Sequence, residues 1–335
     1  MGEAQLLWVQ PDWLDEATGW IRAQLDARGV AQTGEIEQPH VRWWSTVLRV
    51  PTSEGDLYFK ATAPVHRFEA ALTEALQDLV PDRVPELLAV DRARGWMLMR
   101  DGGGRLREVV HSVTDLGRWE EVLPLYAELQ LRVAPHAGEL LELGVPDERL
   151  AGLPARFERL LEEPDRLLID LPDGLTAEEH RKLLDLRPEF AASCEELAGY
   201  GIPETLQHDD FHDGNVFVRD GRYVFFDWGD SCISHPFHTL VVTLRSIAYR
   251  LELEPGAPEL ERLRNAYLEP FARFGRREEL AEAVALAYRI GTLARALAWH
   301  RFVSAMETPF RDENADAVPY GLKRFLAGGP IGTWR

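Results

Sequence analysis

Carboxylates, imidazoles and side-chain amides are concentrated in a short stretch in the second half of the chain, residues 207–230. Asp210 stands five residues before Asn215, and Asp227 stands twelve residues after Asn215. Phosphoryl transfer uses one carboxylate to accept the proton of a hydroxyl group, and an amide and a second carboxylate to hold magnesium on the nucleotide phosphates. The residue types and their spacing therefore predict Asp210 as the catalytic base and Asn215 and Asp227 as ligands of Mg²⁺.

Two short runs inside this stretch, residues 216–218 and 222–226, have the β-branched and aromatic content of strands. The dipeptide Asp220-Gly221 between them is a strong signal for a tight hairpin turn. A hairpin here brings the loop before Asn215 next to the loop after Phe226. The polar residues are therefore expected to converge at the open end of the hairpin.

The pattern His208-x-Asp210-x-x-x-x-Asn215, followed by Asp227-Trp228-Gly229, resembles the catalytic and metal loops of the aminoglycoside phosphotransferase and choline kinase family, which are relatives of protein kinases. The family usually has Gly where this chain has Asp209. Asp210 is the predicted base because it alone has the required spacing to Asn215.

The resemblance implies an α+β, bilobed, protein-kinase-like fold. It places a small N-terminal antiparallel sheet with one key helix before a larger, mostly helical C-terminal lobe. It also implies ATP and Mg²⁺ as cofactors, and a structural role for His208, which hydrogen-bonds the catalytic loop in the family. The roles of Asp209, His212, Asp213 and Asp230 stay open at this point, between substrate contact and hydrogen bonding within the loop or at a helix cap.

The first hundred residues show the element order that a kinase N-terminal lobe has. A helix is expected at residues 11–28, with an apolar stripe that favours packing in the core over ligand stacking. Strands and one further helix then follow in the order strand 41–50, strand 57–62, helix 66–79, strand 86–91 and strand 95–100.

Lys60 lies in the second of these strands, in a chain with only three lysines among 37 basic residues. A lysine in a chain that so strongly prefers arginine indicates a site that needs a compact ammonium group. The element order then predicts that Lys60 grips the α- and β-phosphates and pairs with a glutamate of the following helix. Glu69 is the predicted partner, and Glu74 is the second choice. A strand lysine whose ammonium reaches solvent is the alternative.

The segment expected to cover the phosphates, near residues 42–46, contains no glycine. Ser45 and Thr46 are the candidates to supply hydroxyl or amide groups there. Gly102, Gly103 and Gly104 mark a break in regular structure, and residues 101–104 are predicted to be the hinge between lobes. In the resembling family this linker contacts adenine, which implies backbone contacts from Arg100 and Gly102 and places Met99 at the back of the pocket.

The remainder, residues 105–335, reads as a helical C-terminal lobe that carries the catalytic and metal loops, whereas residues 1–100 form the nucleotide-binding lobe. The expected helices are 116–132, 148–161, 176–199, 237–251, 259–274, 278–303 and 318–326.

Composition narrows the class of protein. The net charge of −19 disfavours a nucleic-acid partner, because phosphates would be repelled. Two cysteines far apart argue against a disulfide framework or a zinc site and favour a reducing, cytoplasmic location. The start of the chain has no signal-peptide pattern, and no apolar run is long enough to span a bilayer, so no membrane association is expected. Oligomeric state is not indicated.

We therefore predict an ATP-dependent phosphotransferase that acts on a hydroxyl group of a small molecule. The acidic balance of the chain suits a cationic acceptor, such as an amino sugar, an aminoglycoside or an amino alcohol, while a neutral sugar also fits. Two alternatives remain: a degenerate kinase that only binds nucleotide, and a metal-dependent phosphohydrolase built on the adjacent His208-Asp209 pair. ATP or GTP as donor and any link to antibiotic resistance are left open by the sequence.

Overall fold

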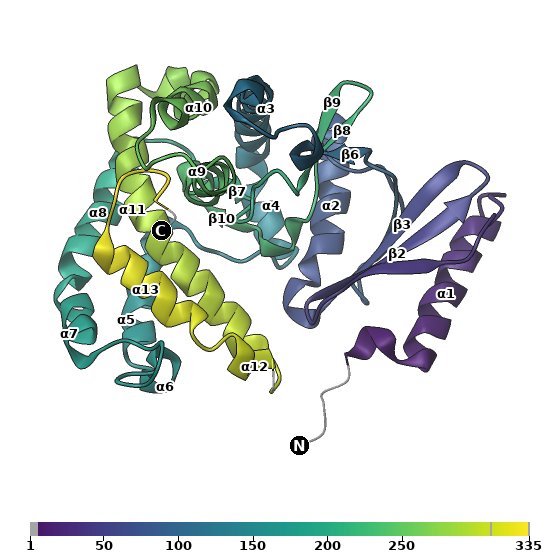
Figure 1. Ribbon diagram of the computed structural model, residues 1–335, viewed down its shortest axis with the longest axis horizontal. Helices are drawn as coiled ribbons and strands as arrows, with labels where there is room; N and C mark the ends of the chain where they lie inside the picture. Colours follow the sequence, from purple (N-terminus) through teal and green to yellow (C-terminus); the bar gives the residue numbers. More distant parts are fainter. Residues whose placement is uncertain (1–5, 309, 334–335) are drawn as a thin grey trace.

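The computed structural model describes residues 6–308 and 310–333 and has two lobes of different character (Figure 1). The N-terminal lobe is built on a five-stranded antiparallel sheet with the strand order β1-β2-β3-β5-β4. The strands are β1 (Glu37–Val41), β2 (Ser45–Thr52), β3 (Gly55–Thr62), β4 (Leu87–Asp91) and β5 (Trp96–Arg100). The bilobed α+β fold expected from the sequence is confirmed.

The two faces of this sheet have different partners, because side chains alternate along each strand. On β3, Leu57 and Phe59 are buried under α1 (Pro11–Asp26), which covers the outer face of the sheet in Figure 1. Lys60 points to the opposite face, toward α2 (Phe68–Leu79) and the second lobe. The apolar stripe of α1 is therefore core, as expected, and the functional face of the sheet is the inner one.

The glycines after β5 are required because the linker lies close against the β8–β9 hairpin (residues 216–225) and the residue after it. A Cβ on Gly102 would lie 2.5 Å from the ring of Phe226, and one on Gly103 would lie 2.4 Å from the carbonyl oxygen of Val218. Gly103 also has a φ of +94°, a backbone conformation that residues other than glycine rarely adopt. The linker between the lobes thus lies directly against the segments that carry Asn215 and Asp227.

The C-terminal lobe is mostly helical and has one large apolar core. Its helices are α3 (Gly117–Val133), α4 (Ala137–Glu142), α5 (Leu153–Leu161), α6 (Pro164–Leu167), α7 (Ala177–Asp185), α8 (Arg187–Gly199), α9 (Thr239–Arg250), α10 (Pro258–Leu268), α11 (Arg277–Ala305), α12 (Phe310–Glu313) and α13 (Ala317–Ala327). The longest, α11, runs beside α13 and extends toward the N-terminal lobe (Figure 1).

Several expected helices are shorter or divided, because proline has no N–H to donate inside a helix. The helix expected at 176–199 is two helices, α7 and α8, and Pro188 stands in the first turn of α8. The helix expected at 148–161 starts at Leu153 after a 3₁₀ turn, again with a proline in its first turn. In the first case the start of the helix was predicted correctly and the break before Arg187 was missed, and in the second case the N-terminal boundary was wrong.

Two small sheets complete the lobe and hold the polar loops. One pairs β7 (Thr205–Gln207) with β10 (Cys232–Ser234), and the other has the order β6-β8-β9, with β6 (Gly104–Arg105), β8 (Val216–Arg219) and β9 (Arg222–Phe225). Within the described part of the chain, none of the helices combines the length and hydrophobicity needed to cross a bilayer.

Candidate active site

The hairpin β8–β9 is the element that assembles the polar site. Its turn residues Asp220 and Gly221 both have positive φ, 50° and 74°, which gives the turn the twist that two-residue hairpins favour. At the open end, the Phe226 amide donates to the Asn215 carbonyl over 2.9 Å. Asn215 and Asp227, the two predicted metal ligands, therefore leave neighbouring strands at the same edge.

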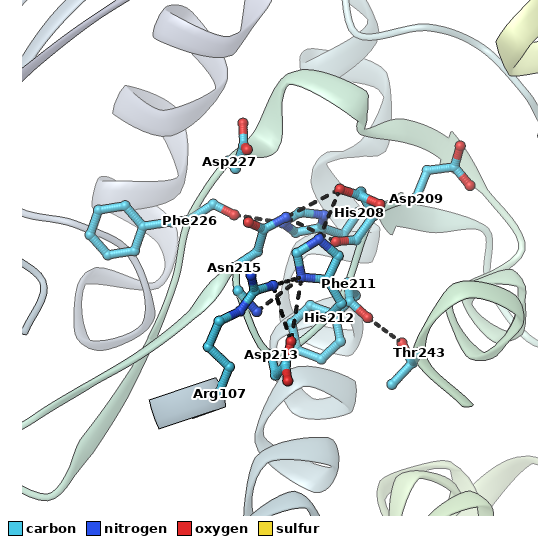
Figure 2. Close-up of polar contacts among 12 residues, drawn as sticks. Arg107, His208, Asp209, Phe211, His212, Asp213, Asn215, Phe226, Asp227 and Thr243 are labelled. Atoms are coloured by element: carbon cyan, nitrogen blue, oxygen red, sulfur yellow. Dashed lines mark hydrogen bonds and ion pairs between the residues drawn. The ribbon is translucent and has the colours of Figure 1, made fainter. Parts of the chain in front are cut away.

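The loop before β8 is held by hydrogen bonds that fix its shape (Figure 2). The side-chain nitrogen Nδ2 of Asn215 donates to the backbone carbonyl oxygen of Asp210 over 3.0 Å. The side-chain oxygen of Asn215 is therefore the atom left to accept a hydrogen bond or bind a cation. The buried imidazole of His208 lies 2.7 Å from the Phe226 carbonyl, and burial lowers its pKa. His208 is therefore uncharged and donates to that carbonyl. This hydrogen bond connects the loop to the start of the segment that carries Asp227, so His208 has a structural position.

The carboxylate of Asp210 is surrounded by donors. His212 Nε2 lies 3.3 Å from one carboxylate oxygen, and Arg295 Nη2 lies 3.5 Å from the other. Burial alone would raise the pKa of Asp210, but the hydrogen bond from His212 and the charge of Arg295 outweigh it and hold the pKa well below its usual range. Asp210 is therefore a carboxylate at neutral pH, the form that can accept a proton.

Lys60 connects the two lobes. Its Nζ lies 2.6 Å from Glu69 on α2 and 2.6 Å from Asp227, so the ammonium sits between one carboxylate from each lobe. Burial would lower the pKa of Lys60, but the two carboxylates together raise it above its usual range. The structure thus brings Lys60 and Glu69 together, whereas Glu74 pairs with Arg92 on the surface.

Asp209, the departure from the usual family pattern, has a local physical explanation. Its φ is +58°, in the left-handed region that favours glycine. Its buried carboxylate is paired with Arg295 of α11 at 2.8 Å and accepts from Gln207 at 3.2 Å. Burial raises the pKa of Asp209 to about 6, although Arg295 opposes that shift. Arg295 thus binds both Asp209 and Asp210, and the sequence prediction did not include it.

Two adjoining cavities of about 490 and 440 Å³ lie between the lobes and share part of their lining, so they form one cleft with two ends. The first end, a slot along the inner face of the sheet, is lined by Val47, Met99, Gly102, Phe217 and Phe226, among others. Phe217 and Phe226 are in contact, with ring centroids 4.3 Å apart. This end offers flat apolar surfaces beside the linker.

The predicted nucleotide-binding residues fall in different places relative to this slot. Met99 and Gly102 line it, and Ser45 lines both ends of the cleft. Arg100 lines neither cavity, because its guanidinium pairs with Glu54 and Glu86 and its backbone N–H donates to the Glu86 carbonyl over 3.0 Å. The hydroxyl of Thr46 is buried and donates to the His40 carbonyl, and its side chain lines neither cavity.

The second end contains Asp210 together with residues that the sequence did not identify. Arg107 comes from the segment after β6 and lies 3.2 Å from Asp213. The buried Asp213 also pairs with Arg250 at 2.6 Å, so it anchors the loop, whereas His212 lines the cleft. Asp230 lines this end as well. The other lining side chains absent from the prediction are His40, Trp43, Trp44, Thr62, His66, Arg105, Trp299 and Phe302.

Comparison with known proteins identifies the family of the chain. The model of the phosphotransferase enzyme family matches residues 31–280 of the chain. A search of curated proteins finds no match.

Solved structures share the fold at low sequence identity. An ethanolamine kinase from Plasmodium vivax matches with a TM-score of 0.61 and 16% identity, covering 96% of this chain and 89% of that chain. A macrolide 2′-phosphotransferase from Brachybacterium faecium matches with a TM-score of 0.58 and 16% identity, covering 90% and 97%. An amicoumacin kinase in complex with AMP-PNP, Ca²⁺ and Ami matches with a TM-score of 0.51 and 10% identity, covering 97% and 98%.

Proposed function

The chain belongs to the phosphotransferase enzyme family, and from that premise we propose that it transfers the γ-phosphate of ATP to a hydroxyl group of a small molecule. The observation that carries the proposal is the position of Lys60. Its ammonium lies 2.6 Å from both Glu69 and Asp227, at the point where the two ends of the cleft meet. A positive charge held there by one residue of each lobe suits a chain of phosphates that passes between them.

The slot beside the linker is the proposed site for the nucleotide base. Phe217 and Phe226 form one apolar surface, and Val47 of β2 contributes to the lining across from the linker. We propose that the carbonyl of Arg100, whose N–H is bonded to Glu86, and the backbone of Gly102 contact the edge of the base. With this arrangement we propose residues 101–104 as the hinge between an N-terminal lobe, residues 1–100, and a C-terminal lobe, residues 105–335.

Asn215 and Asp227 are the proposed ligands for Mg²⁺. The amide nitrogen of Asn215 is occupied by the Asp210 carbonyl, so its amide oxygen is the atom left for a cation. Asp227 has a φ of +64° and a side chain that is 51% exposed, in the cleft. Two oxygen ligands suit an ion that takes its others from phosphates and water, and the bound ion would neutralise phosphate charge. Ca²⁺ and AMP-PNP in the amicoumacin kinase structure support this choice of cofactors.

Asp210 is the proposed catalytic base. The acceptor oxygen forms a bond to the γ-phosphorus while the bond from that phosphorus to the bridging oxygen breaks, and its electron pair leaves with ADP. Asp210 takes the proton of the acceptor hydroxyl late in this step. Its lowered pKa makes it a weak base, which suits a loose transition state in which it mainly orients the hydroxyl.

For the acceptor we propose an amino sugar, an aminoglycoside or an amino alcohol. The ethanolamine kinase and the macrolide 2′-phosphotransferase, which share this fold, support a small-molecule alcohol as the class of acceptor.

Replacing Asp210 by asparagine tests the proposal. Asp210→Asn should lower kcat by about 10²–10⁴-fold, the range that general acid–base groups contribute. The affinity for Mg-ATP, measured by calorimetry, should stay within about twofold, because Asp210 is proposed to contact the acceptor and not the nucleotide. Asp185→Asn on the exposed surface of α7 is the matched control. Unchanged turnover in Asp210→Asn would contradict the proposed role, and nucleotide binding without any turnover in the wild type would favour a degenerate kinase.

A further inference from the structure

An unbroken row of aromatic rings forms one wall of the cleft at the end that holds Asp210. Trp44 contacts Trp43 with ring centroids 5.4 Å apart, and Trp43 contacts His66 at 6.4 Å. His66 contacts Phe302 at 5.0 Å, and Phe302 contacts Trp299 at 6.1 Å. All five residues line the same cavity as Asp210. The wall therefore runs from the β1–β2 turn of the first lobe to the end of α11 in the second.

The turn that carries Trp43 and Trp44 occupies the position where a loop covering the phosphates was expected. Its backbone is fixed by the indole of Trp8, which donates to the Arg42 carbonyl over 2.6 Å, and by the Arg42 amide, which donates to Ser45 over 2.9 Å. Neither tryptophan lines the slot beside the linker. Trp43 instead packs with Phe302 in a small apolar cluster that joins the two lobes. The turn thus faces the acceptor end of the cleft.

The carboxylates at this end are not equally available. Asp210 is paired with Arg295 and His212, and Asp227 is paired with Lys60. Asp230 is different, because its only ionic contact among the described residues is His66, whose Nε2 lies 3.5 Å away. The imidazole nitrogens of His66 have no hydrogen-bond partner in the described part of the chain. The aromatic wall therefore stands beside one carboxylate that forms no direct ion pair with lysine or arginine in the described part of the chain, and Arg295 acts on its charge only from a longer distance.

We propose that the β1–β2 turn, residues 42–44, forms the specificity wall for the phosphate acceptor, and that with Trp299, Phe302 and Asp230 it selects an alcohol bearing a single ammonium group on an apolar body. Aromatic faces attract a cation and stack on apolar groups. One carboxylate balances one ammonium, whereas each further ammonium of a polycation would be desolvated without a partner. The inference rests on the proposed phosphotransfer and narrows its acceptor from the wider set above.

A matched set of three acceptors tests the charge requirement. The probes are 2-(benzylamino)ethanol, with one ammonium and one ring, its neutral analogue 2-(benzyloxy)ethanol, and the polycation kanamycin. Each is assayed with Mg-ATP for ADP release and for quenching of tryptophan fluorescence, because three tryptophans line this end of the cleft. The amine should be bound and phosphorylated, the neutral ether should have a KM about tenfold higher, and kanamycin should not be phosphorylated.

Truncation of the wall tests the position of the turn. Trp44 is 37% exposed, so Trp44→Ala should leave the fold intact. The KM for the amine should rise about tenfold, and the KM for Mg-ATP should stay within about twofold. Trp299→Ala should have the same signature. Tyr320→Ala, an exposed aromatic on α13 that is 54% exposed, is the control and should change neither constant.

The outcomes separate the inference from the proposed function. Phosphorylation of kanamycin in preference to the amine would overturn the inference and leave phosphotransfer standing. A rise in the KM for Mg-ATP in Trp44→Ala, with the acceptor KM unchanged, would also overturn it, because the turn would then cover the nucleotide. ATP bound but never transferred would contradict the proposed function. In that case, if the amine quenches the tryptophan fluorescence of the wild type and Trp44→Ala weakens this quenching, the result would still support the wall as an ammonium site.

Discussion

The two ends of the cleft hold charge in different ways. At the proposed nucleotide end, the ammonium of Lys60 is held between the carboxylates of Glu69 and Asp227. At the acceptor end, aromatic rings form the wall and Asp230 contacts only an imidazole among the described residues. The first end therefore suits the metal-bound polyanion that we propose, which would replace existing ion pairs, and the second suits the proposed acceptor, an apolar body with one ammonium group.

The ends also differ in how they are built. The polar part of the nucleotide end comes from one strand, one helix and one hairpin, and its contacts are set by short segments. The acceptor end is assembled from the β1–β2 turn and from α11, which meet only in the folded chain. Under the proposed function, this difference means that acceptor selectivity could change through the turn and α11 without disturbing the phosphate site.

Among variants that test this comparison of the two ends, the largest effect is expected from Lys60→Met, which removes the charge that joins the lobes. Loss of an electrostatic group aimed at the reacting phosphate should lower kcat/KM for ATP by about 10²–10³-fold. Lys60→Arg should lose nearly as much, because the planar guanidinium does not fit a position 2.6 Å from each of two carboxylates. Steady-state kinetics measure both variants against Lys182→Met, an exposed lysine of α7. Full activity in Lys60→Arg would remove the argument for a compact ammonium.

Arg295 provides the next test, since it supports the loop of Asp210 from the acceptor side. Arg295→Met leaves Asp209 buried and unpaired, and removing one partner of a buried ion pair costs about 3–5 kcal/mol of unfolding free energy. The double variant Asp209→Gly with Arg295→Met should recover most of that loss, because glycine tolerates the φ of +58°. Denaturant titration gives the comparison. A double variant as unstable as Arg295→Met alone would show that the Asp209 charge is not the cause.

The smallest expected effect is a change in the pH dependence of stability. It comes from His238, a buried histidine that packs against α11. A Cβ on Gly291 of α11 would lie 3.1 Å from the His238 ring, and the imidazole bonds Ser234 at 2.9 Å. Burial lowers the pKa of His238 to about 3 from an unfolded value near 6.5. Between these two pKa values, His238 binds a proton in the unfolded state but not in the native state. The free energy of unfolding therefore decreases as the pH falls below 6.5.

The variant His238→Asn, which keeps a hydrogen-bonding group near Ser234, should remove this part of the pH dependence. Between pH 7 and pH 5.5, the wild type should lose about 1 kcal/mol more unfolding free energy than the variant. His136→Asn at the surface serves as the control. Equal acid sensitivity of wild type and His238→Asn would exclude His238 as a source of it.

The sequence predicted the parts of the site that short segments determine. The Asp220-Gly221 turn and the spacing from Asp210 to Asn215 and Asp227 placed three side chains correctly relative to the hairpin. Lys60 and Glu69 followed from the order of strands and helix. These signals are local, so they could be read before any tertiary contact was known.

The rest of the site depends on tertiary packing. Arg295 and Trp299 lie on a long helix whose pattern reads as a core stripe with a solvated face, and nothing in the sequence indicates that one turn of α11 reaches Asp209. The sequence showed Trp43 and Trp44 only as part of a loop without glycine, because the packing of Trp43 with Phe302 joins opposite ends of the chain. The helix starts at Leu153 and Arg187 were missed for a local reason, the placement of proline in a first turn.

The most direct test of the account is a ³¹P NMR time course of the wild-type protein with Mg-ATP and the acceptor set. The account predicts that a phosphomonoester resonance of the amine grows in step with ADP, mole for mole, and that both are absent in Asp210→Asn. Release of ADP accompanied by inorganic phosphate alone, with every acceptor present, would contradict transfer to an alcohol.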